Sequence, residues 1–307
     1  MDMSLINLLP ILMAASTPIL LAGLGELVVE RAGVLNLGVE GMMIIGAITG
    51  FIAAVETGSP ALGFICGSLG GAALSLIFAM LTQSLKSNQV ATGLALTLFG
   101  LGFASLLGQN YVGVKPPGTD ELPIPILADL PVVGPLLFQH DPLVYISLIF
   151  VAAIWAVLKF SRMGLILRAV GENHDAAHAL GYKVVRLRYL AILFGGAMAG
   201  LGGAYLSLIR VPQWTDGMTA GAGWIALALV VFAGWRPWRL LIGAYLFGGV
   251  TVLQLNMQAA GVNVPVELLS MSPYLITIAV LVLISANRGR GGSGAPGSLG
   301  QGFHASR

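Results

Sequence analysis

Long apolar runs separated by short polar stretches dominate this 307-residue chain. A helix that crosses a lipid bilayer needs about 20 mostly apolar residues, or somewhat fewer when neighbouring helices shield it. With only 9% charged residues, the chain also lacks the charge that covers the surface of a soluble globule. We therefore expect an all-α, polytopic transmembrane helix bundle of about 8–10 spans. The nine candidate runs are Leu5–Gly25, Met42–Val55, Ala61–Leu81, Val90–Gly108, Leu143–Lys159, Leu190–Ile209, Gly223–Gly234, Leu240–Ala260 and Pro273–Ala286.

Two of these runs are short for a complete crossing, namely Met42–Val55 and Gly223–Gly234. Each follows a polar stretch that contains glycine, Glu26–Gly41 in the first half of the chain and Arg210–Ala222 in the second. Interrupted hydrophobic segments at corresponding places in two halves are typical of broken helices beside a transport pathway. The sequence therefore predicts two broken or short helices in pseudo-repeated halves.

Basic residues indicate the orientation and the domain plan. The largest basic group lies in residues 160–189, which the positive-inside rule places in the cytoplasm. Strict alternation then places the loop 110–142 and the N-terminus outside, and the C-terminus in the cytoplasm. We expect residues 1–286 to form a single transmembrane domain. Residues 287–307 are rich in glycine and are predicted to form a disordered cytoplasmic tail.

Several classes of function lack their residues in this chain. A net charge of +2 without a dense basic stripe argues against nucleic-acid binding. No Gly-Lys-Ser/Thr sequence is present, so the chain has no phosphate-binding nucleotide loop of its own. No histidine or cysteine cluster falls at membrane depth, which leaves no catalytic set for an intramembrane protease. His174 and His178 have a spacing that could hold a metal, but without a third ligand a solvated helix face is favoured, and we expect no metal site.

The polar stretch after the first run carries three carboxylates. Glu26 and Glu30 are one helical turn apart and share a face, where Arg31 could neutralise one of them. Asn36 and Glu40 follow before the next apolar run. A charge at bilayer depth costs about 2.5–3.5 kcal/mol, so such residues usually face a bundle interior or a water-filled pathway. A plain polar turn at the membrane surface explains them equally well.

Four tryptophans in the second half have two predicted roles. Trp235 and Trp238, beside Arg236, are typical of an anchor at the membrane–water interface. Trp214 and Trp224 lie near the second short run, where an indole could stack on a ring of a solute. The pathway or substrate candidates are therefore Glu26, Glu30, Asn36, Glu40, Trp214 and Trp224.

The segment 164–181 contains a candidate docking helix. Glu172–Leu180 is predicted to form a short helix with acidic residues at its start and Gly181 as its stop. Apolar positions exposed on such a helix suit docking into a groove of another protein. An ordinary amphipathic connector on the membrane surface fits the same pattern.

Four blocks of the sequence are informative together, namely residues 30–43 (ERAGVLNLGVEGMM), 87–95, 168–181 and 219–228. They resemble blocks of the bacterial ABC-importer permeases of the nucleoside and simple-sugar type, which belong with the ribose and branched-chain amino acid permeases. Residues 30–43 resemble the ERxGVxNxGxEGMM signature of that family. Residues 87–95 resemble its SNQxxxGLA block, and residues 168–181 resemble its RAVGENxxAAxxxG cytoplasmic loop. Residues 219–228 resemble its second-half glycine block.

The resemblance implies a permease subunit of the bacterial cytoplasmic (inner) membrane that moves a nucleoside or a related simple sugar. Its implied partners are an ATP-binding subunit that carries ATP and Mg²⁺, a second homologous permease subunit or a copy of itself, and an extracytoplasmic substrate-binding protein. The chain itself would hold no cofactor and would not be an enzyme. Glu30–Gly41 would line or shape the pathway. The residues that couple to the ATPase would be Arg168, Gly171, Glu172, Asn173, Ala176, Ala177 and Gly181.

Other functions remain compatible with the residues alone. A proton-coupled secondary transporter would use Glu26, Glu30 or Glu40 as a proton-carrying carboxylate. A non-transporting membrane scaffold would need no reactive residues. An ABC permease for another solute, such as a branched-chain amino acid, would differ only in its substrate. Three carboxylates beside one arginine suit a neutral, hydroxyl-rich solute better than an anion.

Overall fold

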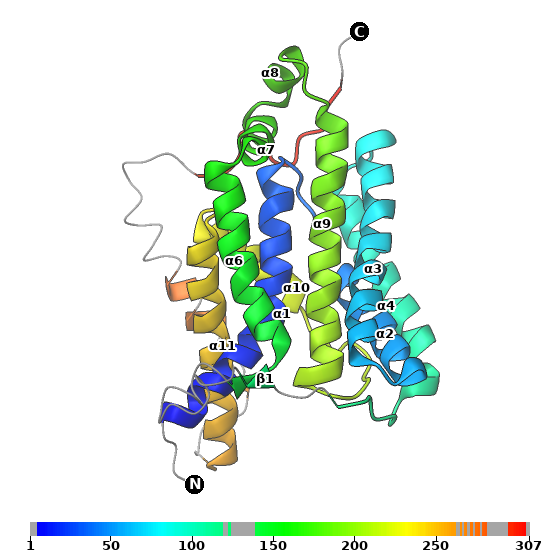
Figure 1. The fold of residues 1–307 in the computed structure, drawn as a ribbon, viewed down its shortest axis with the longest axis vertical. Coiled ribbons are helices and arrows are strands. Elements are labelled where there is room, and N and C mark those ends of the chain that lie inside the picture. The colour runs from blue at the N-terminus through cyan, green and yellow to red at the C-terminus, as the bar shows by residue number, and fades with distance from the viewer. Residues whose placement is uncertain are drawn as a thin grey trace.

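The computed structural model describes residues 5–118, 122–123, 139–261 and 294–304, together with short pieces between residues 265 and 280. The chain forms a bundle of long helices that run in broadly the same direction (Figure 1). One end of the bundle carries α8 (His174–Ala179) and residues 294–304, and we call it the α8 end. The opposite end carries β1 (Leu122–Pro123), and we call it the β1 end.

Seven helices in the described residues are long and apolar enough to cross a membrane, which confirms the predicted polytopic all-α fold. Two of the seven, α3 and α9, continue into π-helical turns at Met80–Ser84 and Leu206–Arg210. The seven are α1 (Leu5–Arg31), α2 (Val39–Thr57), α3 (Pro60–Ala79), α4 (Gln89–Gly108), α6 (Pro142–Phe160), α9 (Val184–Tyr205) and α11 (Pro237–Ala259).

The prediction of two short helices is half right. The second, α10 (Ala222–Ala233), has 12 residues and a length of about 18 Å, too short for a hydrocarbon core of about 30 Å. The first, α2, has 19 residues because it begins at Val39, before the predicted start at Met42. The ninth run, Pro273–Ala286, lies mostly outside the described residues.

The first helix also extends further than predicted. The apolar run ends at Gly25, but α1 continues to Arg31, so Glu26 and Glu30 are helical. Neither glycine nor proline occurs between Gly25 and Gly33, and Gly33 adopts a left-handed φ of 81° and turns the chain. The break between the first two helices is therefore shorter than the polar stretch Glu26–Gly41.

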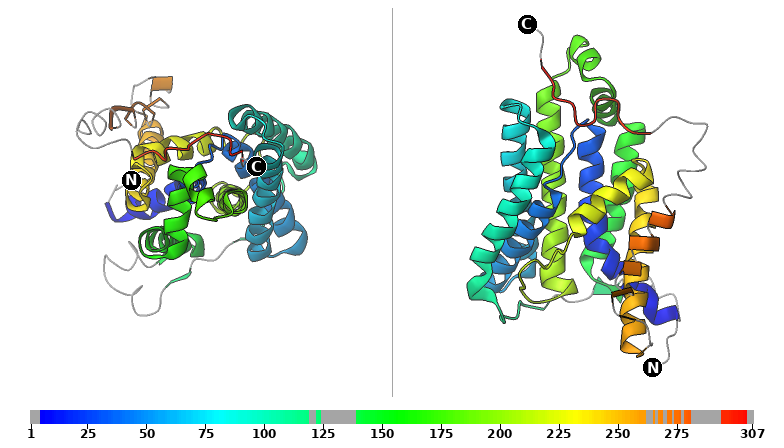
Figure 2. Two further views of the ribbon diagram at one scale, coloured as in Figure 1. Left: turned by 90° about the horizontal axis from the view of Figure 1, so that it is seen from above. Right: turned by 180° about the vertical axis from the view of Figure 1, so that it is seen from behind.

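The central helix of the bundle is α9, which packs against α1, α2 and α3. On one side α4 covers α2, and on the other α6 and α11 pack against α1 (Figure 2). Small residues allow these backbones to touch. A Cβ atom at Gly67 of α3 would lie 2.6 Å from Cβ of Ala204 and 2.8 Å from the carbonyl oxygen of Gly46. Such contacts replace the hydrophobic force that is absent between helices in lipid.

The loop predicted outside, residues 110–142, connects α4 to α6 at the β1 end. Two short strands lie in it, β1 and β2 (Gln139–His140), and they pair antiparallel. Most of the remaining loop lies outside the described residues.

Residues 294–304 are ordered against the α8 end, so the predicted disorder of the tail 287–307 is wrong for this part. The backbone nitrogen of Ser298 donates to the carbonyl oxygen of Gly171 (2.8 Å), and that of Gly300 donates to the carbonyl oxygen of Gly33 (3.2 Å). Ser298 is 4% exposed. The tail therefore lies across both the start of the α1–α2 connection and the end of α7 (Arg162–Glu172). Residues 287–293 and 305–307 lie outside the described residues.

Candidate functional site

The two polar stretches meet at Glu40, in the first turn of α2. Its Oε1 accepts hydrogen bonds from Oγ1 of Thr219 (2.5 Å) and from the backbone nitrogen of Gly221 (2.9 Å). Its Oε2 accepts from the backbone nitrogen of Gly223 (2.7 Å). These amides belong to the N-terminus of α10, where free N–H groups and the helix dipole favour a negative charge. Glu40 is 2% exposed, and its carboxylate caps the short helix from the other half of the chain.

The contact between α2 and α10 is too close for a side chain at Gly223. A Cβ atom there would lie 2.6 Å from Cα of Glu40. Next to it, Nε1 of Trp224 lies 3.4 Å from the carbonyl oxygen of Leu37, to which it donates. Thr97 of α4 donates from Oγ1 to the same oxygen (3.1 Å). The start of α2, the start of α10 and the helix α4 therefore converge around residues 37–40.

Glu26 and Asn36 hold the connection between α1 and α2 from inside. Asn36 donates its backbone nitrogen to Oε1 of Glu26 (3.3 Å) and its Nδ2 to Oε2 (3.2 Å). The Oδ1 atom of Asn36 accepts from the backbone nitrogen of Gly38 (3.0 Å), just before α2 begins. Both side chains are buried, so the carboxylate substitutes for the backbone partners that a non-helical connection lacks.

Glu30 and Arg31 both turn to Trp235 and do not pair with each other. Trp235 donates from Nε1 to Oε2 of Glu30, while Oε1 of Glu30 is buried without a partner. Arg31 donates from Nη2 to the carbonyl oxygen of Trp235 (3.0 Å). In the described chain no ion pair joins Arg31 to Glu26 or Glu30, so the predicted neutralisation is wrong. Successive helical residues point in different directions, and Trp235 lies 204 positions away in the sequence.

Of the six residues predicted for the pathway, only Trp224 is substantially exposed, at 45%. Glu26, Glu30, Asn36 and Glu40 are each at most 2% exposed. Trp214 is 1% exposed, has no hydrogen-bond partner at Nε1, and packs against Gly108. Trp235, predicted as an interfacial anchor, is also buried, whereas Trp238 is 45% exposed. The buried carboxylates therefore support the backbone where α2 meets α10. Of the six predicted residues, Trp224 is the one that exposes its side chain at this junction.

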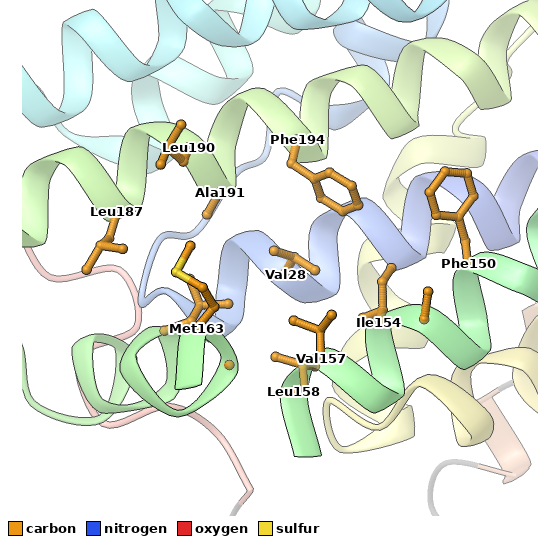
Figure 3. Close-up of a pocket in the computed structure, with 13 residues that line it drawn as sticks. Val28, Phe150, Ile154, Val157, Leu158, Met163, Leu187, Leu190, Ala191 and Phe194 are labelled. Carbon is orange, nitrogen blue, oxygen red and sulfur yellow. The ribbon is translucent and has the colours of Figure 1, made fainter. Parts of the chain in front are cut away.

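A cavity of about 350 Å³ lies between α1, α6, α7 and α9 (Figure 3). Its lining is apolar, including Val28, Phe150, Met163, Leu187 and Phe194. None of the predicted pathway residues lines it. Binding sites for polar solutes need a few placed polar groups to fix orientation. This cavity offers none and is not a candidate solute site.

Between α6 and α9 the chain forms two helices, α7 and α8, where the short helix Glu172–Leu180 was predicted. Helical geometry is interrupted at Asn173, between α7 and α8, so residues 172–180 do not form a single helix. Oδ1 of Asn173 accepts from the backbone nitrogen of Ala176 (2.9 Å), which starts a new helix. Gly181, with a left-handed φ of 88°, ends α8 as predicted.

The predicted coupling residues lie on two sides of this segment. Gly171 and Ala177 are buried: Gly171 packs against the carbonyl group of Arg31, and Ala177 packs in a small cluster with Phe303. These two residues hold the segment to the bundle. The outward-facing ones are Arg168, Glu172, Asn173, Ala176 and Gly181.

His174 lies between α8 and the tail and is only 7% exposed, so the solvated helix face predicted for it is wrong. Its Nδ1 is 3.3 Å from Nη2 of Arg188, its ring centroid is 5.4 Å from that of Phe303, and its backbone nitrogen donates to Oγ of Ser298 (3.2 Å). Burial, and then the charge of Arg188, lower the pKa of His174. Among the described residues, no three His, Cys, Asp or Glu side chains are grouped to bind a metal.

Sequence reasoning missed the partners of the carboxylates, namely Thr219, Gly223 and Trp235. One signal was available for the first two. The second glycine block starts a short helix, and the free N–H groups of a buried helix start require an acceptor. Nothing in the sequence indicated which of the three glutamates supplies it.

The chain is similar to known permeases along most of its length. The profile of the family described as branched-chain amino acid transport system / permease component matches residues 8–284. The chain is 46% identical over 289 residues to the "Putative glucose ABC transporter permease protein TsgC13" of Haloferax volcanii, covering 87% of this chain and 88% of that protein. It is 32% identical over 298 residues to the "Nucleoside ABC transporter permease protein NupC" of Lactococcus lactis subsp. cremoris, covering 92% and 94%. It is 31% identical over 301 residues to the "Guanosine ABC transporter permease protein NupQ" of Bacillus subtilis, covering 91% and 93%. No solved structure gives a significant match.

Proposed function

The chain belongs to the family of permease components of branched-chain amino acid transport systems, and on this premise we propose that it is the membrane-spanning subunit of an ATP-driven importer of a nucleoside or a related sugar. It is a multi-pass membrane protein and a transport component rather than an enzyme. The observation that carries the substrate proposal is the match, along nearly the whole chain, to permeases named for glucose, nucleosides and guanosine. The branched-chain amino acid alternative rests on the family description alone.

A separate ATP-binding subunit, which carries ATP and Mg²⁺, docks at the α8 end. Two features support this proposal. The helix α8 stands out from the bundle (Figure 1). Ala176 of α8 is exposed, as are Glu172 at the end of α7 and Leu180 just after α8, the last at 76%. A short helix with exposed apolar residues suits a groove on a partner. The basic residues of this end also favour the cytoplasmic side, which gives an outer N-terminus and a cytoplasmic C-terminus.

A short path of contacts leads from the docking helix to the junction of the broken segments. Gly171, at the end of α7, packs against the carbonyl group of Arg31 and the backbone nitrogen of Gly33. From Gly33 the connection runs through Asn36 to Glu40, which holds the start of α10. A displacement of α7 by the ATPase would therefore move the connection between α1 and α2, and with it both broken segments.

The solute passes beside the junction of α2 and α10. Trp224 exposes its indole there, and an aromatic face can stack on a nucleobase, a contact worth about 1–3 kcal/mol. Glu26, Asn36 and Glu40 fix the backbone behind it. A second homologous permease, or a second copy of this chain, closes the pathway on the side of Trp224. An extracytoplasmic binding protein delivers the solute at the β1 end.

Uptake of radiolabelled guanosine, glucose and leucine tests the proposal, in vesicles that contain the complete transporter with and without internal ATP. We expect ATP-dependent uptake of guanosine or glucose. Ala176→Trp should abolish it without lowering the amount of protein in the membrane. Ala152→Trp, on an exposed face of α6 away from both sites, is the matched control and should transport normally. Preference for leucine would overturn the substrate proposal. Uptake driven by a pH gradient without ATP would instead indicate a secondary transporter.

A further inference from the structure

A second pocket, of about 440 Å³, opens at the α8 end where α6 ends and α11 begins. It is bounded by α1, α6, α7 and the turn between α10 and α11. Five cationic side chains line it: Arg31, Lys159, Arg168, Arg236 and Arg239. They come from four separate parts of the chain, so no single basic stretch of sequence indicates the cluster.

Among the described residues, none of these cations forms an ion pair within 4 Å. The one ion pair found there within 4 Å joins His174 to Asp175, outside this pocket. Glu172 lines a neighbouring pocket with Arg31 and Arg168, but it forms no ion pair with either. Nε of Arg31 is buried without a hydrogen-bond partner. Uncompensated like charges that face one cavity repel each other and favour an anionic ligand.

The aromatic side chains around the pocket place it at the membrane–water boundary. The ring centroids of Trp155 and Trp238 lie 6.3 Å apart in an edge-on arrangement. Nζ of Lys159 lies 5.0 Å from the centroid of Trp155. Tryptophan with Lys or Arg at the ends of spanning helices marks the headgroup level of a bilayer. The pocket therefore lies at the depth of the lipid headgroups, so a lipid phosphate is the anion nearest to it.

We propose that this pocket binds the headgroup of an anionic phospholipid from the surrounding leaflet. The phosphodiester lies among Lys159, Arg236 and Arg239, since basic pockets between membrane helices are suited to such headgroups. The acyl chains follow the outer face of α11, where Ile242 is 67% exposed and Trp238 offers an apolar ring. Arg168 brings α7 into the site, so the lipid ties the docking segment to α6 and α11.

Native mass spectrometry of the purified full chain tests this site. The protein is exchanged into micelles with equal amounts of phosphatidylglycerol and phosphatidylcholine, and retained lipid is counted. We expect retained phosphatidylglycerol. In the double variant R236Q/R239Q its binding should fall about 30-fold, from about 1 kcal/mol for each basic residue. The control R162Q/R186Q removes two exposed cations from the same end but outside the pocket, and it should retain the lipid.

Each other outcome is informative. Equal retention of phosphatidylcholine, or equal loss in both double variants, would overturn a specific anionic site. Displacement of the lipid by excess inorganic phosphate would assign the pocket to a soluble anion and overturn the lipid proposal. A second measurement does not depend on the arginine variants. Phosphatidylglycerol with brominated chains should quench tryptophan fluorescence, and W155F/W238F should remove most of that quenching. Neither measurement needs transport activity, so its result stands apart from the proposed function.

Discussion

The hydrogen bonds of Glu40 lead to the sharpest prediction about this fold. Its carboxylate accepts from Thr219, Gly221 and Gly223 at the start of α10, and it is almost completely buried. Glu40→Ala leaves three donors without an acceptor in the interior. Glu40→Gln keeps one oxygen, which can still serve Thr219 and Gly221, but it turns an amide NH₂ toward the N–H of Gly223.

The number of unsatisfied donors sets the size of the effect. A buried donor without a partner costs about 1–3 kcal/mol, so Glu40→Ala should lower the free energy of unfolding by about 3–9 kcal/mol. Glu40→Gln loses one acceptor and should cost about 1–3 kcal/mol. At about 2 °C per kcal/mol for a large domain, Glu40→Ala should lower the melting temperature by at least about 6 °C. Glu40→Gln should lower it by about 2–6 °C.

The assay is thermal unfolding of the detergent-solubilised chain, followed by the fraction that stays monodisperse at each temperature. Glu56→Ala is the control, because Glu56 is an exposed carboxylate at the other end of α2. The hydrogen bond that Glu56 accepts from Oη of Tyr111 (2.8 Å) is exposed to solvent and contributes little. We expect the control to melt close to the wild type, followed by Glu40→Gln and then Glu40→Ala. Identical melting of Glu40→Ala and Glu56→Ala would refute the capping role. A fully stable Glu40→Gln that no longer transports would show that Glu40 acts on the solute directly.

Three other predictions concern different parts of the molecule. Trp224→Ala should raise the solute concentration for half-maximal uptake, whereas Trp224→Phe should keep most of the stacking; equal uptake by both would contradict a role in the pathway. Burial and the charge of Arg188 lower the pKa of His174. His174 therefore holds a proton less often when the tail 294–304 is packed against it than when the tail is released. Docking should be strongest above about pH 6.5 and weaken as the pH falls through the lowered pKa, measured by hydrogen exchange of residues 298–304 corrected for intrinsic rates; a profile unchanged by His174→Gln would contradict this. Gly67→Ala should destabilise the bundle by about 1–3 kcal/mol, while Gly102→Ala, which meets nothing within 4 Å, should not; similar melting of the two would contradict close packing at Gly67.

The helices of this protein are largely predictable because hydrophobicity along the chain is a local property. Each apolar run within the described residues forms a helix. The short run Gly223–Gly234 predicted the short helix α10. The partners of the polar residues were not predictable. Glu40 finds Thr219 across 179 positions, and Arg31 finds Trp235 across 204. Such pairs are chosen by the packing of whole helices, and a single sequence contains no record of that packing.

The α8 end shows a second reason why prediction failed. A short helix, α8, does lie within the predicted helix Glu172–Leu180, but which residues of this segment face outward depends on a tail that composition alone described as disordered. A glycine-rich segment has few side chains to bury against the entropy of ordering it. Here Pro296, Ser298 and Phe303 are buried, and backbone hydrogen bonds to Gly33 and Gly171 add to their contacts. Three buried residues in a tail that is otherwise rich in glycine hardly change its composition.

The position of residues 294–304 in the chain has a consequence for biosynthesis. They follow every described span in sequence, so they leave the ribosome after those spans have been made. Until they arrive, Arg188 lacks the carbonyl group of Gln301, to which it donates at 2.9 Å, and the ring of His174 lacks Phe303. A chain interrupted before residue 294 would enter the membrane with its described spans present but with the surface beneath α8 unfinished. An ATP-binding subunit that docks at this end, as proposed above, would then distinguish finished chains from interrupted ones.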